Sequence, residues 1–286
     1  MGIYELTERL ERLEGLDDFA GTVADLVGKL VPPGGLKNAL SGTWLGHTLH
    51  PVLTDLPIGT WTSAALLDLV GGEDSAKAAE LLVGLGILSS LPTAASGFSD
   101  WADTQEGERR VGLVHALSNT AALGLLSGSY AARRRGSRRA GVVLGLMGTG
   151  VATFGAYLGG HLTMGLGVGT NQAALEEGLP EWTAVTDSAA LDKGRPVKAV
   201  YEGTQLVLVK LGSRFYGLSS RCSHLGGPLE DGELDGKAIT CPWHGSSFDL
   251  EDGAVVEGPA RCPQPAYEVR ERDGKIEVRL REPARA

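Results

Sequence analysis

The sequence has few of the residues that carry chemistry or cross-links. Its 286 residues include only 3 cysteines and 6 histidines, and three cysteines cannot build a disulfide framework. Basic residues are also in the minority. The formal charge of −9 argues against a nucleic-acid partner, because binding a polyanion needs a basic face. A secretory signal with a cleavage site is not expected, since residues 1–30 are heavily charged.

Charge is scarce in one half of the chain and common in the other. Residues 38–175 carry few charges and are rich in Gly, Ala and Leu, whereas residues 181–286 alternate charged and β-branched residues. The length is sufficient for two domains. The contrast between the halves predicts two domains of different kinds.

Residues 1–46 are expected to form an amphipathic helical segment. Apolar residues recur at steps of three and four from residue 4 to residue 30, which predicts one helix with an apolar face. The stretch "VPPGG" at 31–35 ends it. We expect this helix to lie against the rest of the protein or on a membrane surface, and a dimerising coiled coil is the alternative.

Four apolar segments within residues 47–165 predict a four-helix transmembrane domain. They cover 51–70, 79–99, 111–132 and about 140–160. Lengths of about 20 residues match the roughly 30 Å hydrocarbon core of a bilayer. The alternative is a soluble bundle, but uncharged runs of this length lack the polar face that such a bundle needs. The chain is therefore expected to be a multi-pass protein of the cell membrane.

The charges of the connecting loops predict an orientation. The short loops at 71–78 and 133–139 share one side of the membrane, and the second reads "RRRGSRR". Positively charged loops favour the cytoplasmic side. The part of the chain after the fourth helix is then expected on the extracytoplasmic side, although Arg109 and Arg110 on the opposite side weaken the bias.

Residues 166–180 are expected to be a Gly-rich linker, followed by an all-β domain over 181–286. Short β-prone runs are separated there by Gly, Asp and Asn turn signals. They read "KAVYEG", "QLVLVKL", "RFYGLS", "KAITC", "SSFDL", "AYEVRER" and "KIEVRL". The expected fold class is α+β multidomain, an all-α four-helix transmembrane bundle followed by an all-β domain.

Two mixed Cys/His pairs stand in the β-rich region. Cys222 and His224 belong to "CSHLGG", and Cys241 and His244 belong to "CPWHGS". Thiolate and imidazole ligands together indicate zinc or an iron–sulfur cluster. Zinc fingers usually separate their cysteines from their histidines, whereas a Rieske [2Fe–2S] centre gives one iron two cysteines and the other iron two histidines. Two loops that each carry one cysteine and one histidine could supply the ligands of a Rieske centre.

The full pattern "CSHLGG…CPWHGSSFDLEDG…GPA" resembles the Rieske domain family across essentially all of 181–284. The resemblance implies a [2Fe–2S] cluster, with Cys222 and Cys241 on the inner iron and His224 and His244 on the outer iron. It also implies cofactor neighbours within the two loops, namely Leu225, Pro242, Trp243 and Ser246. Zinc, or a metal-free relative, is the alternative.

Two departures from the family pattern carry information. Rieske proteins of respiratory cytochrome bc complexes have an extra cysteine in each loop, and here those positions are Gly227 and Trp243. The domain therefore resembles the ferredoxin-type branch. Phe248 stands where high-potential relatives carry a tyrosine, which leaves Ser246 as the expected hydroxyl donor to a cluster sulfur. A low or intermediate reduction potential is expected.

The other histidines, His47, His50, His115 and His161, fall at helix ends on one side of the expected bundle. Ionisable groups in a membrane are functional candidates. The stretches "HPVLTDLPIG", "GFSDW" and "YLGGHL" resemble a bacterial family of predicted four-helix membrane proteins of unknown function, over 38–168. We hypothesise that His50, with His115 or His161, ligates a haem b, since bundles commonly build cofactor sites this way. Another metal, a quinone site or a structural role are the alternatives.

Together these features predict a membrane-anchored Rieske protein that passes single electrons between a membrane donor, quinol or haem, and a partner protein. The alternatives are the membrane-tethered electron-delivery component of an oxygenase or nitrite reductase, and a redox sensor or scaffold without electron flux. A Rieske oxygenase is not expected, because no histidine follows His244 to complete a mononuclear iron site.

Overall fold

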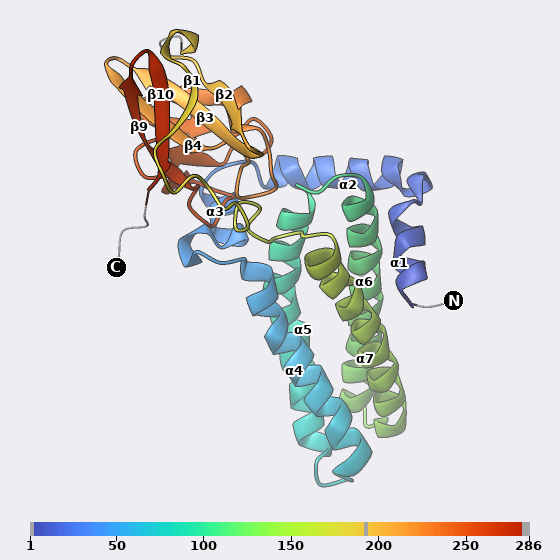
Figure 1. Ribbon diagram of the computed structural model, residues 1–286. Helices are drawn as coiled ribbons and strands as arrows, with labels where there is room; N and C mark the ends of the chain where they lie inside the picture. Colours follow the sequence, from blue (N-terminus) through green and yellow to red (C-terminus); the bar gives the residue numbers. More distant parts are fainter. Residues whose placement is uncertain (1–2, 192–193, 282–286) are drawn as a thin grey trace. The chain divides into compact units, whose positions relative to one another are not determined.

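The computed structural model describes residues 3–191 and 194–281 (Figure 1). It divides into two compact units. The helical unit comprises Met1–Val31 and Leu49–Val168, and the C-terminal unit comprises Pro32–Thr48 and Gly169–Ala286. Residues 32–48, assigned from the sequence mainly to the N-terminal segment, therefore group with the β-rich part of the chain. So do residues 169–180, which were expected to form a linker.

The N-terminal helix is interrupted, and the single helix expected over 4–30 is wrong. Helix α1 spans Ile3–Glu11, a short 3₁₀ turn spans Glu14–Leu16, and α2 spans Asp17–Leu30. Figure 1 shows α1 and α2 running in different directions. Leu13 leaves the helical conformation at ψ 70°, and Gly15 follows in a position where glycine weakens a helix. Asp17 and Asp18 then favour a new helix start through the helix dipole.

The four apolar segments form long helices, as predicted. They are α4 Leu49–Val70, α5 Ala76–Trp101, α6 Glu106–Arg134 and α7 Arg138–Gly160, with α7 continued by a π turn at His161–Gly165 (Figure 1). By length and apolar composition, α5, α6 and the continuous helix Arg138–Gly165 are able to cross a membrane. The crossing of α4, which carries Asp55 and Asp68, stays a prediction.

The helical unit packs glycines closely against its buried side chains and leaves many large apolar side chains exposed. A Cβ on Gly86 would lie 2.1 Å from Trp61 Nε1, and one on Gly148 would lie 2.7 Å from Leu126 Cγ. Large apolar side chains are exposed along the helices: Leu56, Ile58, Leu66, Leu69, Leu81, Leu85, Leu88, Leu91, Leu117, Val143 and Met147. Close approach through small residues is typical of helices in lipid, and so many exposed apolar side chains are rare on soluble monomers. The packing is that of a membrane domain.

A buried ion pair joins the ends of α4 and α6. The side chains of Arg133 and Asp68 are 3% and 2% exposed. Arg133 Nη1 donates to Asp68 Oδ1 at 2.9 Å, and Nη2 donates to the other carboxylate oxygen. Arg133 Nε also donates to Ser129 Oγ at 3.2 Å. Removing one partner of such a pair leaves an uncompensated buried charge.

We predict that Asp68→Ala destabilises the protein by about 3–5 kcal/mol, because Arg133 stays buried without its carboxylate. The measurement is the free energy of unfolding in detergent micelles. The matched control is Glu73→Ala, since Glu73 is 85% exposed and pairs with Arg138 at 3.3 Å; its cost should stay below about 1 kcal/mol. Equal losses in the two variants would contradict the assignment.

The C-terminal unit holds two antiparallel sheets, with strand orders β1-β10-β9-β4-β3-β2 and β5-β6-β7-β8. The strands are β1 Thr183–Asp187, β2 Val197–Tyr201, β3 Thr204–Leu211, β4 Arg214–Ser219, β5 Glu233–Asp235, β6 Ala238–Thr240, β7 Ser247–Asp249, β8 Val255–Glu257, β9 Ala266–Arg272 and β10 Lys275–Leu280. The seven runs expected from the sequence are confirmed as β2, β3, β4, β6, β7, β9 and β10. The sequence did not predict β1, β5 or β8. Helix α3, Gly35–Ser41, also belongs to this unit.

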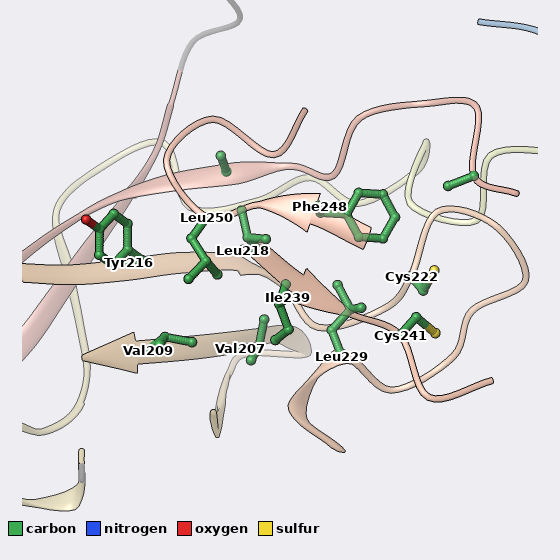
Figure 2. Close-up of a cluster of buried hydrophobic side chains, with 12 residues drawn as sticks. Val207, Val209, Tyr216, Leu218, Cys222, Leu229, Ile239, Cys241, Phe248 and Leu250 are labelled. Atoms are coloured by element: carbon green, nitrogen blue, oxygen red, sulfur yellow. The ribbon is translucent and has the colours of Figure 1, made fainter. Parts of the chain in front are cut away.

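Strand β3 explains how the core reaches the functional loops. Its apolar run alternates between two faces: Leu206 and Leu208 enter one core, and Val207 and Val209 enter the other. The second core is built from both sheets and ends at the two cysteines of the motifs (Figure 2). Burial on both faces therefore accounts for the continuous run "LVLV" and anchors the sheet beneath the Cys/His loops.

Candidate metal centre

Two loops with the same backbone hydrogen bonds carry the Cys/His pairs. In the first, Cys222 N donates to Gly227 O at 2.9 Å and Gly226 N donates to Cys222 O at 2.8 Å. In the second, which joins β6 to β7, Cys241 N donates to Ser246 O at 2.8 Å and Gly245 N donates to Cys241 O at 3.1 Å. The same spacing of donors and acceptors recurs in both. The loops are therefore near copies, each presenting its cysteine first and its histidine two or three residues later.

Glycine closes each loop in a left-handed conformation. Gly226 and Gly245 both have φ of 78°, a region that side chains with a Cβ rarely adopt. In each loop this glycine is the fourth residue after the cysteine. Gly245 of "CPWHGS" therefore corresponds to Gly226, the first glycine of "CSHLGG". Gly227, the second glycine of that motif, does not have a left-handed φ.

The two cysteines lie side by side at the end of the apolar core (Figure 2). Both are buried and neither forms a disulfide. Their thiols are hydrogen bonded to each other, which lowers the pKa of Cys241 to about 7, whereas donation to Cys241 and burial raise the pKa of Cys222. Sulfurs this close can share one metal ion, and thiolates are the form that binds it.

Backbone N–H groups surround both sulfurs in matching positions. Those of His224 and Leu225 donate to the sulfur of Cys222, and those of Trp243 and His244 donate to the sulfur of Cys241. Such donors stabilise negative charge on sulfur and tune a metal bound to it. Leu225 and Trp243 are two of these donors, and their predicted role as cofactor neighbours stays a prediction.

The histidines of the two loops also meet. The ring centroids of His224 and His244 are 5.2 Å apart, with ring planes at 85°. His224 is 5% exposed, and His244 is half-buried. The pKa of His224 lies well below its ordinary value, chiefly because of burial and further through Arg261, His244 and Lys37. A low pKa keeps the imidazole neutral, which is the state that binds metal.

The arrangement fits a two-iron cluster better than a single ion. Among residues 3–191 and 194–281, no three or more His, Cys, Asp or Glu side chains gather as ligands of one ion. A Rieske cluster asks for only two protein ligands on each iron. The close thiol pair and the separate imidazole pair match that demand. A Cβ on Gly227 would lie 2.8 Å from Cys241 Sγ and 3.1 Å from Trp243, so the space beside the sulfurs is open only because this residue is glycine.

Comparison with known proteins supports the same assignment. The model of the Rieske [2Fe-2S] domain family matches residues 181–268, and that of a predicted membrane protein family (DUF2231) matches residues 46–172. Ferredoxin CarAc of Metapseudomonas resinovorans is 33% identical over 73 residues, which cover 26% of this chain and 68% of that protein. The chain belongs to the Rieske [2Fe–2S] domain family.

Two further matches are with ferredoxins of dioxygenases. The 3-phenylpropionate/cinnamic acid dioxygenase ferredoxin subunit of Escherichia coli (strain K12) is 34% identical over 96 residues, covering 30% of this chain and 91% of that protein. The solved ferredoxin of carbazole 1,9a-dioxygenase from Nocardioides aromaticivorans IC177 is 28% identical, with a TM-score of 0.33 and coverage of 35% of this chain and 98% of that chain. The likeness to the curated ferredoxin sequences shows that the Rieske domain is of the ferredoxin type and that the chain is an electron carrier.

The Rieske domain braces its first loop with a residue that the sequence analysis missed. Gln264 is buried, and its side chain accepts from Ser223 N at 3.0 Å and donates to Ser219 O and Arg221 O at 2.9 and 2.5 Å. It thus fixes both ends of the segment that carries Cys222. A lone glutamine between two prolines gave no signal of this role, because its partners are backbone groups over 40 residues away.

The other residues in and near the two loops differ in burial and in hydrogen bonding. Ser246 is buried, and its Oγ accepts from Ala260 N at 3.0 Å. The hydroxyl proton of Ser246 is not used in this hydrogen bond. The expected donation of that proton to a cluster sulfur stays a prediction. Phe248 is fully buried in the core, whereas Pro242 is exposed at the loop surface. Cys262 is a free, partly buried thiol, and its carbonyl accepts from Ser223 Oγ at 2.8 Å.

In the helical unit, His50 and His115 lie together and His161 does not join them. The ring centroids of His50 and His115 are 6.3 Å apart. His50 Nδ1 donates to Thr93 O at 2.9 Å and His115 Nδ1 donates to Gly155 O at 2.8 Å. His161 Nε2 instead contacts Glu11 Oε1 at 2.8 Å. His47 is exposed within residues 32–48 of the other unit.

We predict that Gly227→Ala lowers the iron content of the purified protein several-fold, because the new methyl group would press on Cys241 Sγ and Trp243. Overpacking of this kind costs about 1–3 kcal/mol. Iron and acid-labile sulfide per chain are the measurements. The control is Gly124→Ala, where a Cβ meets nothing within 4 Å. Full iron in Gly227→Ala, with an unchanged cluster spectrum, would show that the space beside the sulfurs is not needed.

Proposed function

We propose that this chain is a membrane-anchored carrier that passes single electrons from a donor in the membrane to a partner protein. The observation that carries the proposal is the joining of two features in one chain. One is the pair of matched loops that bring Cys222 to Cys241 and His224 to His244. The other is the helical unit with large apolar side chains on its outside. The first supplies a redox centre, and the second supplies an anchor in a lipid bilayer.

Cys222, Cys241, His224 and His244 would hold a [2Fe–2S] cluster, which would supply one-electron transfer. The chain contributes the rest. The buried cysteines exclude water from the sulfur side. The backbone N–H groups around both sulfurs stabilise added negative charge without moving, since the loops are fixed by their own hydrogen bonds.

We place the contact with the partner protein at Trp243 and His244. Trp243 is 49% exposed, and its ring centroid is 6.2 Å from that of His244. Exposed tryptophans are favoured anchors of protein interfaces. An electron that leaves through the half-buried histidine ligand would have its shortest path to a partner seated on this edge.

We place the membrane donor at the histidine pair of the helical unit. Because carbonyl oxygens only accept hydrogen bonds, His50 and His115 carry their protons on Nδ1, and Nε2 is the nitrogen with the lone pair. Histidines that bind metal are commonly oriented in this way. The arrangement favours the pair His50 and His115 over His50 and His161 as the site of a haem b or of contact with a quinol. Asn119 Nδ2, at 3.2 Å from His115 Nε2, would have to yield to a metal ligand.

A second function is favoured by the relatives. Their names describe ferredoxin subunits of dioxygenases, so the acceptor of this chain would be an oxygenase, or by extension a nitrite reductase, and the donor a soluble reductase. The loop "RRRGSRR" is consistent with a Rieske domain on the extracytoplasmic side, where a soluble cytoplasmic reductase would not reach it. A redox sensor or scaffold would share the cluster but show no steady flux.

The donor is tested with the full-length protein in liposomes, by following reduction of the cluster after adding a soluble quinol. We expect reduction by quinol to be faster than in a His50→Ala variant with the same iron content. Reduction by NAD(P)H with a ferredoxin reductase, and none by quinol, would favour the oxygenase-delivery function. If neither quinol nor NAD(P)H with a reductase reduces the cluster, the redox sensor or scaffold would be the remaining function.

The haem hypothesis has its own measurement. The protein purified from haem-supplemented cells is expected to show a Soret band that His50→Ala and His115→Ala abolish while His161→Ala retains it, because His161 is engaged with Glu11. The iron–sulfur spectrum serves as the internal control in each variant. No Soret band in the wild-type protein would remove haem and leave quinol contact as the role of the pair.

A further inference from the structure

Two glutamines from distant parts of the chain hold the residues on either side of Cys222. Gln172 lies in the segment that the sequence predicted to be a linker, before the first strand of the Rieske domain, and Gln264 follows the second ligand loop. Both belong to the C-terminal unit. The residues that they hold are Arg221 and Ser223, the two chain neighbours of the cysteine.

Each glutamine bonds to both neighbours. Gln264 Oε1 accepts from Ser223 N at 3.0 Å, and Gln264 Nε2 donates to Arg221 O at 2.5 Å. Gln172 N donates to Ser223 O at 3.1 Å, and Gln172 Oε1 accepts from Arg221 Nη2 at 2.7 Å. The same two residues are therefore held twice, once from each end of the sequence of the domain.

Ser223 is engaged through its N–H, its carbonyl and its hydroxyl. The first two bond to the glutamines, and its Oγ donates to Cys262 O at 2.8 Å. Ser223 is 4% exposed, so these bonds lie away from water. Because it stands directly between Cys222 and His224, a fixed backbone at this residue fixes the starting point of both side chains.

The second loop is held differently, although its internal hydrogen bonds match those of the first. Pro242 and Trp243 stand between Cys241 and His244, and both are exposed. Trp243 is 49% exposed, against 4% for Ser223. The first loop is thus the braced half of the site, and the second loop is the half that meets the surroundings.

One of the two braces comes from outside the part of the chain that matches other Rieske domains. That match begins at residue 181, which includes Gln264 but not Gln172. Gln172 is the last residue of the match with predicted membrane proteins. The segment that follows the last long helix is therefore more than a spacer, since it bonds to a ligand loop of the Rieske domain.

We propose that Gln172 and Gln264 are paired positioning residues of the redox centre. By holding the residue before Cys222 and the residue after it, they keep the sulfur and the imidazole of the first loop in one geometry toward the second loop. Metal ligands depend on such outer partners for their orientation. This role rests on the [2Fe–2S] cluster of the proposed function and is independent of the donor and the acceptor.

The contact of Gln172 is tested with two variants of the full-length protein in detergent. Gln172→Ala removes the acceptor for Arg221, whereas Gln172→Glu keeps one. For the alanine variant we expect amide hydrogen exchange of residues 219–224 to rise about two- to fivefold, the effect of losing one hydrogen bond. Pulsed EPR with ¹⁵N-labelled histidine should show a changed coupling for His224 and an unchanged one for His244. The glutamate variant should restore the wild-type values.

The matched control is Thr183→Ala, which removes the bond from Thr183 Oγ1 to Glu181 O at 3.0 Å on the surface of the same unit. It should change neither the exchange of the first loop nor either histidine coupling. Gln172→Ala with unchanged exchange and coupling would overturn the proposal. So would equal changes at His224 and His244, or a glutamate variant that behaves like the alanine variant.

The pairing of the glutamines is tested by a double-mutant cycle. Gln264→Met removes the hydrogen bonds of that side chain, and it is combined with Gln172→Ala. Because either glutamine still holds the loop when the other is replaced, the double variant should change the exchange free energy by more than the two single variants together. Additive effects would contradict the pairing. If Gln264→Met does not fold, the variants of the partly exposed Gln172 still decide whether that residue positions the loop.

Hydrogen exchange of the first loop does not need the cluster, whereas the histidine couplings do. A protein that binds no iron but shows the expected exchange pattern would contradict the proposed function and the redox role of the glutamines, and it would retain the brace. A protein with a normal cluster whose exchange and couplings ignore Gln172→Ala would overturn the positioning role and leave the proposed function standing.

Discussion

The structure depends on holding two thiol groups beside each other at the end of an apolar core. Cys222 and Cys241 come from loops on different sheets, and the core formed by both sheets ends at their side chains. Each loop is locked by the same pair of backbone hydrogen bonds and by a left-handed glycine. Because the loops are near copies, placing the sulfurs together also places the imidazoles together. One packing constraint thus creates both halves of the proposed ligand set, and Gly227 leaves room beside Cys241 Sγ.

The two units solve opposite packing problems. In the Rieske domain, large apolar side chains such as Leu206 and Val207 fill the interior, because water surrounds it. In the helical unit, glycines such as Gly86 and Gly148 lie close against buried Trp61 and Leu126, while many other leucines face outward, because lipid gives no reward for burying apolar surface. The charged side chains of Arg133 and Asp68 are buried in that interior, where they form an ion pair with hydrogen bonds. The proposed redox centre and the proposed membrane anchor thus belong to different units of one chain.

Features set by local pattern could be predicted, and features set by distant contacts could not. Mixed Cys/His spacing singled out the four residues that the structure brings together in pairs, and alternation or long uncharged runs predicted seven strands and the four long helices. Strands β1, β5 and β8 have three to five residues each and lie at or next to sheet edges, where pairing rather than composition decides their conformation. The break at Gly15 was hidden by an apolar spacing that continues through it. The grouping of residues 32–48 with the Rieske domain and the brace at Gln264 depend on partners far along the chain, which no periodicity reveals.

The account is tested most directly by pulsed EPR of the reduced full-length protein with ¹⁵N-labelled histidine. It predicts strong couplings to two different histidine nitrogens, with one coupling lost from a His224 variant and the other from a His244 variant that still contain iron. A cluster without any coupled histidine nitrogen, or a protein that binds zinc in place of iron, would contradict it.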